Sequence, residues 1–331
     1  MRIKISMKKI LAILTALLLI GGITVQASDM IIESKNQSYN EADSKIKFNG
    51  DVKVTIDDLK VVGDSADVNV TEEQKLDTAT FYDKPYAFEI KKNKKREVKA
   101  NILKVSLITK IVRAEGDTQS VVFEGKTPIV VINSNVQEYN TNTGVMTATG
   151  AVTMLYKDIE TFSNSAEITT DKKTGDLKKL VLIGDAKVKQ EKNESYGDKF
   201  VYNAETGNLE AFGNTTTNAT MDDGAKLVLK SSYQEYNQKR SVFNASGNVR
   251  IWYQDYYAAG PKVTLYPDPT TKKPNEAYFT GRSSITQGVR TIFADRIKMV
   301  MKPKSFDAQG NTRTIIKNVG SGSDENMTLG L

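Results

Sequence analysis

The side chains that most often perform catalysis are missing from this chain. It has 331 residues, none of which is histidine or cysteine. The lack of histidine excludes Ser-His-Asp and Cys-His catalysis and the commonest ligands of zinc and iron, and the lack of cysteine excludes disulfide bonds. Carboxylates are plentiful, but no spacing suggests a glycosidase pair facing across a cleft. The sequence therefore predicts a binding or scaffolding protein, with no enzymatic activity, metal or cofactor.

One polar motif recurs at a fixed spacing. The pattern Ser-x-x-Gln-x-Tyr-Asn occurs three times, at 34–40, 134–140 and 231–237. A glycine follows each of these tyrosines by eleven residues, at Gly50, Gly150 and Gly247. A fixed period means that one supersecondary unit is copied along the chain. The Tyr-Asn pair, with the polar residues after it, is typical of a hairpin reversal, so the sequence predicts a stack of similar β-hairpins.

Apolar and polar side chains alternate around these glycines. A period of two predicts strands with one dry face and one wet face, and the glycine marks a bend or bulge in the strand. The residues that we assign to the dry inner face are Ile46, Phe48, Val52, Val54, Met146, Val152, Met154, Leu180, Leu182, Val188, Phe243, Val249, Ile251 and Ile285. The hydroxyl groups expected on this face are those of Thr215, Thr217, Ser283, Tyr156 and Tyr253. Lys53, Lys187 and Arg250 are expected on the opposite, wet face.

The N-terminus has the composition of an export signal. Four basic residues precede or adjoin an apolar run from Ile10 to Ile23, and Val25-Gln26-Ala27 supplies a small-residue cleavage site. We expect 1–27 to be a signal peptide that is removed on export to the periplasm; its retention as an inner-membrane anchor is the alternative. The segment carries four of the 46 basic residues and none of the 40 acidic ones. The remaining chain is therefore nearly neutral, which does not fit a nucleic-acid-binding protein.

Two repeat regions are expected after the signal peptide. Residues 28–133 form the first, in which 71–130 keeps the apolar alternation but loses the glycine spacing, and 134–331 form the second, continuous with the first. The basic run Lys91–Arg96 fits either a solvated hairpin tip or a contact for anionic headgroups. A stack of hairpins leaves an unpaired strand at each end, here Met30–Tyr39 and Thr312–Asn318, which predicts edge-to-edge association.

Several short phrases resemble those of one protein family. They are Thr149-Gly150-Ala151-Val152, Ile183-Gly184-Asp185-Ala186 and Ser246-Gly247-Asn248-Val249. With the export signal and the Tyr-Asn turns, most of 34–320 resembles the OstA-like lipopolysaccharide-transport family, and within it the soluble periplasmic bridge proteins. The resemblance implies an all-β fold, a repetitive antiparallel β-jelly roll folded as a V, whose dry groove takes lipid acyl chains. The implied partners are lipopolysaccharide or a related glycolipid, further copies of the chain and other jelly-roll transport proteins joined edge to edge. Nucleic acid is not expected, and a membrane is met only through these partners.

Three functions fit the sequence. The first is a non-enzymatic carrier or bridge that binds and transports lipopolysaccharide between the inner and outer membranes. The second is the membrane-anchored partner of the same export pathway, and the third is a repetitive structural or surface protein with a filled core and no ligand. Burial of an acyl chain of ~12 carbons gains roughly 10 kcal/mol at most, at about 0.8 kcal/mol per CH₂. The inner face fits an open groove and a filled core equally well.

Overall fold

The computed structural model describes residues 30–317 except 57, 74, 92–93, 157, 222–223 and 272–273. The predicted signal peptide at 1–27 lies outside the described residues, as does Asn318 of the second predicted edge strand. In the described part of the chain no candidate membrane-spanning helix occurs. The chain divides into two compact units: unit 1 is Met1–Lys157 with Asn164–Lys178, and unit 2 is Asp158–Ser163 with Lys179–Leu331.

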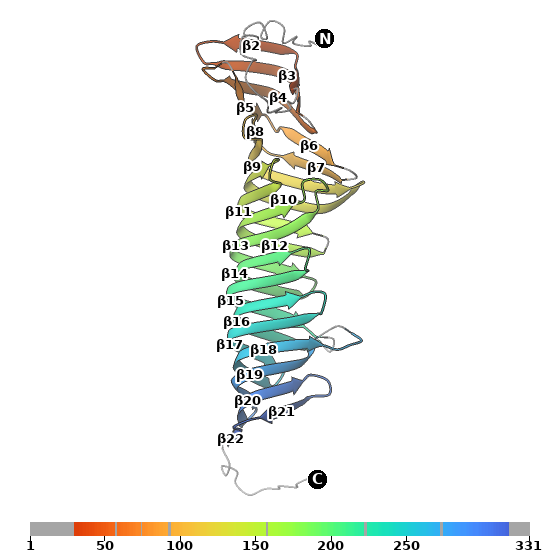
Figure 1. The fold of residues 1–331 in the computed structure, drawn as a ribbon, viewed down its shortest axis with the longest axis vertical. Helices are drawn as coiled ribbons and strands as arrows, with labels where there is room; N and C mark the ends of the chain where they lie inside the picture. Colours follow the sequence, from red (N-terminus) through yellow and green to blue (C-terminus); the bar gives the residue numbers. More distant parts are fainter. Residues whose placement is uncertain are drawn as a thin grey trace, which may run out of the picture. The chain divides into compact units, whose positions relative to one another are not determined.

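The described residues form 22 strands, and the strand pairs within each unit are antiparallel (Figure 1). The strands of unit 1 are β1 (Met30–Glu33), β2 (Asn36–Asn40), β3 (Lys45–Ile56), β4 (Leu59–Val70), β5 (Leu76–Tyr82), β6 (Tyr86–Lys91), β7 (Lys94–Lys99), β8 (Ile102–Ser106), β9 (Ile111–Glu124), β10 (Thr127–Asn140) and β11 (Val145–Tyr156). Strands β12 (Ile159–Thr170) and β13 (Leu177–Gln190) contribute residues to both units. The further strands of unit 2 are β14 (Asn193–Asn203), β15 (Asn208–Thr220), β16 (Lys226–Asn237), β17 (Val242–Tyr253), β18 (Tyr256–Pro267), β19 (Pro274–Gln287), β20 (Arg290–Val300), β21 (Ser305–Gln309) and β22 (Arg313–Ile316). The expected all-β fold, a repetitive antiparallel β-jelly roll, is confirmed.

The long strands bend at a pair of residues with positive φ. In β3, Gly50 and Asp51 have φ of 76° and 49°, and the pairing with β4 shifts its register between Asn49 and Val52. In β15, Gly213 and the asparagine after it repeat this conformation, with φ of 71° and 47°. Glycine and Asx residues enter the left-handed region at the lowest steric cost, and a bulge there bends the strand. The bend lets the inward residues on both sides of the glycine face the same interior.

The Tyr-Asn pairs end their strands in Asx turns. The side-chain oxygen Oδ1 of Asn140 accepts hydrogen bonds from the backbone N–H groups of Asn142 and Thr143, at 2.9 and 3.0 Å. Asn203 Oδ1 accepts from the second and third residues after it in the same way, both at 3.0 Å. An Asx side chain can therefore start the reversal by capping the backbone of its own turn. The predicted role of the pair in hairpin reversal is confirmed.

The stretch 71–130, which lacks the glycine spacing, keeps the same ladder of strands. Strand β4 pairs with β5 along one half and with β6 along the other, and β9 pairs with β8 and β7 in the same manner. The chain bends between β5 and β6 at Asp83 and Lys84, whose φ values are 63° and 58°. Two non-glycine residues in the left-handed region thus replace the glycine bend, which explains why the sequence spacing disappears here while the strands persist.

Each unit has its own apolar core. The core of unit 1 surrounds Phe81 and Leu103, both 0% exposed. The core of unit 2 surrounds Phe279 and Ile297, both 1% exposed. The compact units differ in kind from the repeat regions expected at 28–133 and 134–331: the units group residues that contact each other, and the regions group residues that share a sequence pattern. Strand β10 runs across residue 133, and the compact units divide between residues 157 and 179.

Candidate functional site

The inner face of the bent strands is the main candidate site. The structure buries eleven of the fourteen residues assigned to it: Phe48, Val52, Val54, Met146, Val152, Met154, Leu180, Leu182, Val249, Ile251 and Ile285. Ile46, Val188 and Phe243 are only half-buried. The four assigned residues of β3 belong to or pack against the core of unit 1, and those of β17 and β19 do the same in unit 2. Their contact with lipid remains a prediction.

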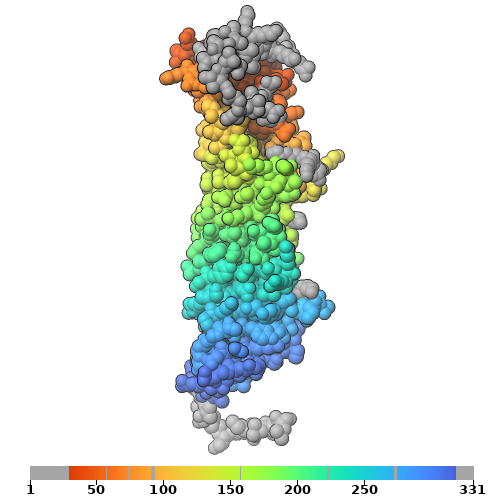
Figure 2. Space-filling model, in the orientation of Figure 1, coloured from red at the N-terminus to blue at the C-terminus, as the bar shows by residue number. Residues whose placement is uncertain are grey.

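The outer face carries the expected charged residues. Lys53 and Arg250 are exposed, and Lys187 is half-buried because its ammonium group pairs with Glu194 at 2.8 Å. Trp252 also faces outward, where its ring lies 5.3 Å from that of Tyr257. In unit 2 the side chains of successive strands cover the viewed face in chain order, from green to blue (Figure 2). The alternation read from the sequence thus gives the correct faces.

The Ser-x-x-Gln part of the motif forms a buried polar cluster in β10. The Thr118 hydroxyl donates to the carbonyl oxygen of Ser134 at 2.7 Å, and the Ser120 hydroxyl donates to Gln137 Oε1. Gln137 Nε2 donates to the carbonyl oxygen of Ile132 at 3.1 Å. The four polar side chains are between 1% and 7% exposed. Because buried polar groups are costly unless hydrogen-bonded, this cluster holds β9 and β10 in register at the bulge.

Strand β16 repeats the cluster in unit 2. The Thr215 hydroxyl donates to the carbonyl oxygen of Ser231 at 2.8 Å, and the Thr217 hydroxyl donates to Gln234 Oε1 at 2.6 Å. Gln234 Nε2 lies 3.4 Å from the carbonyl oxygen of Leu229, to which it donates. The two copies therefore share one arrangement: a hydroxyl pair on one strand meets a serine and a glutamine on the next.

The buried interior is more polar than the sequence pattern predicts. Besides the expected Thr215 and Ser283, the structure buries Thr118, Ser120, Ser134, Gln137, Thr161, Ser163, Ser231 and Gln234. The hydroxyl groups of Thr161 and Ser163 have no hydrogen-bond partner among the described residues. The expectation that Thr215, Thr217, Ser283, Tyr156 and Tyr253 supply the hydroxyls of this face was therefore incomplete, because the serine and glutamine of the motif are buried as well. A signal was present, since each interior Ser-x-x-Gln follows a Gly-x-Thr-x-Ser/Thr sequence by eighteen residues.

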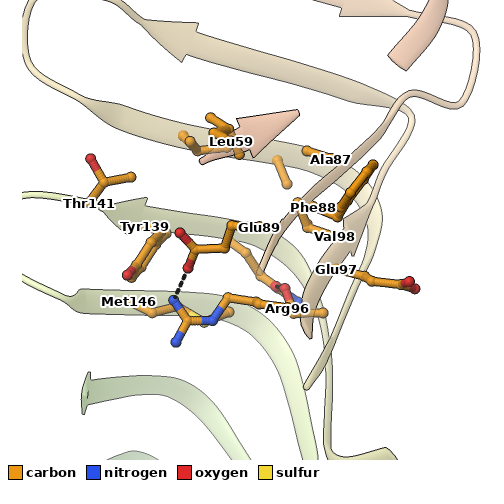
Figure 3. A pocket seen from close by; sticks show the side chains of 14 residues that line it. Leu59, Ala87, Phe88, Glu89, Arg96, Glu97, Val98, Tyr139, Thr141 and Met146 are labelled. Atoms are coloured by element: carbon orange, nitrogen blue, oxygen red, sulfur yellow. Dashed lines mark hydrogen bonds and ion pairs between the residues drawn. The ribbon is translucent and has the colours of Figure 1, made fainter. Parts of the chain in front are cut away.

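A small cavity in unit 1 adds an ion pair to the apolar face (Figure 3). It measures about 50 Å³, and its apolar lining includes Met146. Arg96 Nη1 lies 3.0 Å from Glu89 Oε1, and the guanidinium carbon is 4.5 Å from the ring centre of Tyr139. The Glu89 and Arg96 side chains are 10% and 19% exposed. A largely buried ion pair of this kind marks a polar point on an otherwise apolar surface.

A second cavity of about 230 Å³ adjoins the first and shares Leu59, Glu89, Val112 and Thr141 with it. Its lining also includes Asp58 and Lys110, so it combines apolar walls with charged groups. Drug-sized ligand pockets span roughly 300–1,000 Å³, and one water occupies about 30 Å³ of liquid. An acyl chain therefore enters this interior only if the packed strands move apart.

The basic run Lys91–Arg96 is not simply a solvated tip in its described part. Lys94 forms an ion pair with Asp176, Lys95 with Glu97, and Arg96 with Glu89, whereas residues 92–93 lie outside the described residues. Burial raises the pKa of Glu97, but hydrogen bonds from Lys95 and Tyr86 outweigh it, so this pKa lies below its ordinary value. The pKa of Lys95 is raised, mainly by its hydrogen bond to Glu97. The Lys95 ammonium group therefore remains charged at neutral pH.

Residues 31–126 and 131–228 match the family described as LptA/(LptD N-terminal domain) LPS transport protein. A solved structure that resembles the chain is that of LptH, the LptA homologous periplasmic component of the conserved lipopolysaccharide transport device from Pseudomonas aeruginosa. It is 12% identical, with a TM-score of 0.35, and the match covers 39% of this chain and 95% of LptH. No curated protein sequence matches the chain. Because the family match spans more than half of its residues, the chain belongs to the LptA/(LptD N-terminal domain) family of LPS transport proteins.

Proposed function

We propose that this protein carries the lipid part of lipopolysaccharide, or of a related glycolipid, along its inner face and passes it across the periplasm without chemical change. The observation that carries the proposal is the inner face itself: Val152, Val249 and Ile251 are 1–2% exposed, while neighbouring Arg250 is exposed. Membership of an LPS transport family supplies the substrate class. The export signal read from 1–27 supports a periplasmic location.

The free energy of binding comes from apolar burial rather than from a specific polar contact. An acyl chain of ~12 carbons gains roughly 10 kcal/mol at most when its CH₂ groups leave water. Part of this gain is spent in parting strands that pack against each other in the empty protein. Weak, unspecific contacts suit transport, because a lipid that is not fixed by hydrogen bonds can slide from one strand to the next.

The Glu89–Arg96 ion pair supports an entry point for the lipid in unit 1. It lies beside two adjoining cavities, and Lys110 lines the larger one. An amphiphile would place its acyl chain against Met146 and Val112 while its anionic group faces Arg96 or Lys110. Charge-assisted hydrogen bonds are strong and directional, so these two groups would orient the lipid where it enters, before it slides along the apolar face.

The unpaired strands support the bridging part of the proposal. Among the described residues, β1 and β2 pair only with β3, and β21 and β22 pair only with β20. An exposed edge offers backbone N–H and C=O groups to another strand. Copies joined through these edges would extend the inner face from one molecule to the next.

Native mass spectrometry tests the proposal. The protein is purified without detergent from a bacterium that makes lipopolysaccharide, and a detergent-extracted sample serves as the control. We expect the mass of the chain without residues 1–27, together with glycolipid adducts that detergent removes. A folded protein with no adduct would contradict the carrier function and favour a structural protein with a filled core. A mass that includes 1–27 would favour the membrane-anchored partner instead.

A further inference from the structure

The N-terminal edge of the ladder carries a third copy of the Ser-x-x-Gln motif, with Ser34 between β1 and β2 and Gln37 in β2. The Ser34 hydroxyl donates to the carbonyl oxygen of Asn36 at 3.0 Å. The two interior serines make the same contact to the second residue after them, also at 3.0 Å in each case. The edge motif therefore already has the local conformation that the interior motifs adopt beside a neighbouring strand.

The edge motif lacks the neighbour that its interior copies have. Gln37 is exposed, and its amide makes no hydrogen bond to another described residue. In the interior, the amide of Gln137 or Gln234 is held by a hydroxyl from the preceding strand, Ser120 or Thr217. An edge strand in this conformation fits an incoming strand that presents two hydroxyl groups at alternate positions.

The last strands carry that missing half. The sequence Gly310-Asn311-Thr312-Arg313-Thr314 repeats Gly213-Asn214-Thr215-Thr216-Thr217. The two bends have nearly the same backbone conformation: φ is 75° and 47° at Gly310 and Asn311, and 71° and 47° at the corresponding residues of β15. Thr312 and Thr314 are exposed, and their hydroxyl groups make no hydrogen bond within the described ranges. They stand where Thr215 and Thr217 stand relative to their bend.

The hydroxyl pair is not a general feature of the bends. The second and fourth residues after the other bend glycines are Val52 and Val54, Val152 and Met154, Ala186 and Val188, Val249 and Ile251, and Ser283 and Ile285. Two hydroxyls occur after Gly116, Gly213 and Gly310. The first two are followed by Ser-x-x-Gln eighteen residues later, in the next strand. Within residues 1–331, Gly310 has no such motif after it and Ser34 has no such bend before it.

We propose that a second copy of this chain supplies the partner, and that the hydroxyl pair and the Ser-x-x-Gln motif set one register between β21–β22 of one copy and β1–β2 of the next. This inference rests on the proposed bridging function and specifies how the copies join. The register of β15 on β16 places Thr215 opposite Ser231 and Ala211 opposite Gln234. Transferred to the edges, it places Thr312 opposite Ser34 and Ala308 opposite Gln37.

The same register brings together further side chains of the two edges, of which Phe306 and Ile315 are half-buried and the others are exposed. It places Phe306 opposite Tyr39, which is 58% exposed, and Ile315 opposite Ile31, which is 57% exposed. It also places Arg313 opposite Glu33, a pair of opposite charge. Cross-strand apolar and opposite-charge pairs each stabilise an antiparallel ladder. A shift by one residue would turn every one of these side chains to the wrong face.

Disulfide trapping between two single-cysteine proteins tests the register, because the chain has no cysteine of its own. Ser38 and Asp307 are both exposed and stand opposite each other in the proposed register. A Ser38→Cys protein is mixed with an Asp307→Cys protein under mild oxidation, and Ser305→Cys and Gln309→Cys serve as partners displaced by two residues. Such a displacement moves Cα by about 6.6 Å along the strand, which takes the pair beyond disulfide range.

We expect the Ser38→Cys and Asp307→Cys pair to form the mixed dimer roughly tenfold faster than either displaced pair. Adding Thr314→Val to the Asp307→Cys protein should slow it about fivefold, the effect of one hydrogen bond of ~1 kcal/mol. Adding Ser305→Ala, on the outer face, should leave the rate unchanged. Equal rates for all three cysteine pairs, or a prevailing Ser38→Cys homodimer, would overturn the register while association itself stands. Absence of trapping and of association in sedimentation would overturn the bridge as well, whereas bound glycolipid in the native mass spectrum would still support the carrier.

Discussion

The hydroxyl oxygens of Thr215 and Ser231 lie 2.9 Å apart on neighbouring strands of unit 2, at 1% and 7% exposure. The same pair of side chains recurs in unit 1 as Thr118 and Ser134, whose hydroxyl oxygens are 3.0 Å apart. In both units the pair sits at the bulge where the register of the ladder shifts. A repeated β-stack could slip by two residues without exposing its apolar face, and these buried hydroxyls make such a slip costly.

Replacement of Thr215 by valine tests the stabilising effect of this pair. Thr215→Val keeps the shape of the side chain but removes the donor to Ser231, so the free energy of unfolding should fall by about 1–2 kcal/mol. Thr216→Val on the half-exposed outer face of the same strand is the matched control, with an expected change within about 0.5 kcal/mol. Urea unfolding of both variants provides the measurement. Equal stability of the two would show that the buried hydroxyl has no special role.

Two glycines with the same φ allow backbone strain to be separated from steric contact. Gly144 and Gly175 both have φ of 72° in their turns, but a Cβ at 144 would lie 2.8 Å from the carbonyl oxygen of Thr170. A Cβ at 175 would meet no atom within 4 Å. Gly175→Ala should cost about 1–2 kcal/mol of stability from φ alone, and Gly144→Ala a further ~1–3 kcal/mol. Thermal unfolding that ranks the two variants equally would contradict the contact with Thr170.

The hydrogen bonds of Asp171 in its turn should make the stability of the protein depend on pH in a defined way. A hydrogen bond from Lys178, at 2.9 Å, and the backbone N–H groups of Thr174 and Lys173 hold the pKa of Asp171 well below its ordinary value of 3.8. A carboxyl whose pKa falls on folding contributes stability that is complete above its unfolded pKa of about 3.9. That contribution is lost as the pH falls through the folded pKa.

An NMR titration of the Asp171 carboxyl should therefore show a pKa below 3.8. Lys178→Ala should move this pKa upward, because the backbone donors remain but the charged donor is gone. An unchanged pKa in that variant would mean that the two N–H groups alone are responsible. A wild-type pKa at or above the ordinary value would refute the turn geometry.

The ion pair beside the cavity should matter more than a comparable pair at the surface. Arg96→Met keeps the length of the side chain but removes the charge that faces Glu89, and breaking such a largely buried pair should cost roughly 3 kcal/mol. Arg113 pairs with Glu115 and Glu138 but is 43% exposed. Arg113→Met should cost about 1 kcal/mol or less. Chemical unfolding of both variants at low and high salt compares them, and the reverse ranking would rule out a structural role for the buried pair.

Much of the fold follows from two regularities in the sequence. The alternation around Gly50, Gly150 and Gly247 identifies the strands and their faces because side chains in a strand alternate with a period of two. The Tyr-Asn pairs identify the turns because an Asx side chain caps the backbone of its own turn. The bend within 71–130 could not be predicted from the sequence, because Asp83 and Lys84 adopt positive φ there without the glycine that usually signals it.

The candidate site was less predictable than the fold. The apolar inner face could be read residue by residue, but the buried Glu89–Arg96 pair could not. The two residues face each other in the β6–β7 hairpin, but their surroundings include Tyr139 and Met146 from strands distant in the sequence. The polar clusters at Gln137 and Gln234 were missed although their motif was visible. Their role depends on hydroxyl groups in the preceding strand, and only the structure shows which strands are neighbours.

Photo-cross-linking from the inner and outer faces of the strands tests most directly whether the inner face carries lipid. A photoreactive residue is placed at Val152 or Ile251, which are buried, or at Lys187 or Arg250 on the outer face, and circular dichroism confirms that each variant folds. After irradiation in cells that make lipopolysaccharide, we expect glycolipid adducts from positions 152 and 251 and none from positions 187 and 250. Equal labelling from both faces, or labelling from the outer face alone, would contradict the account.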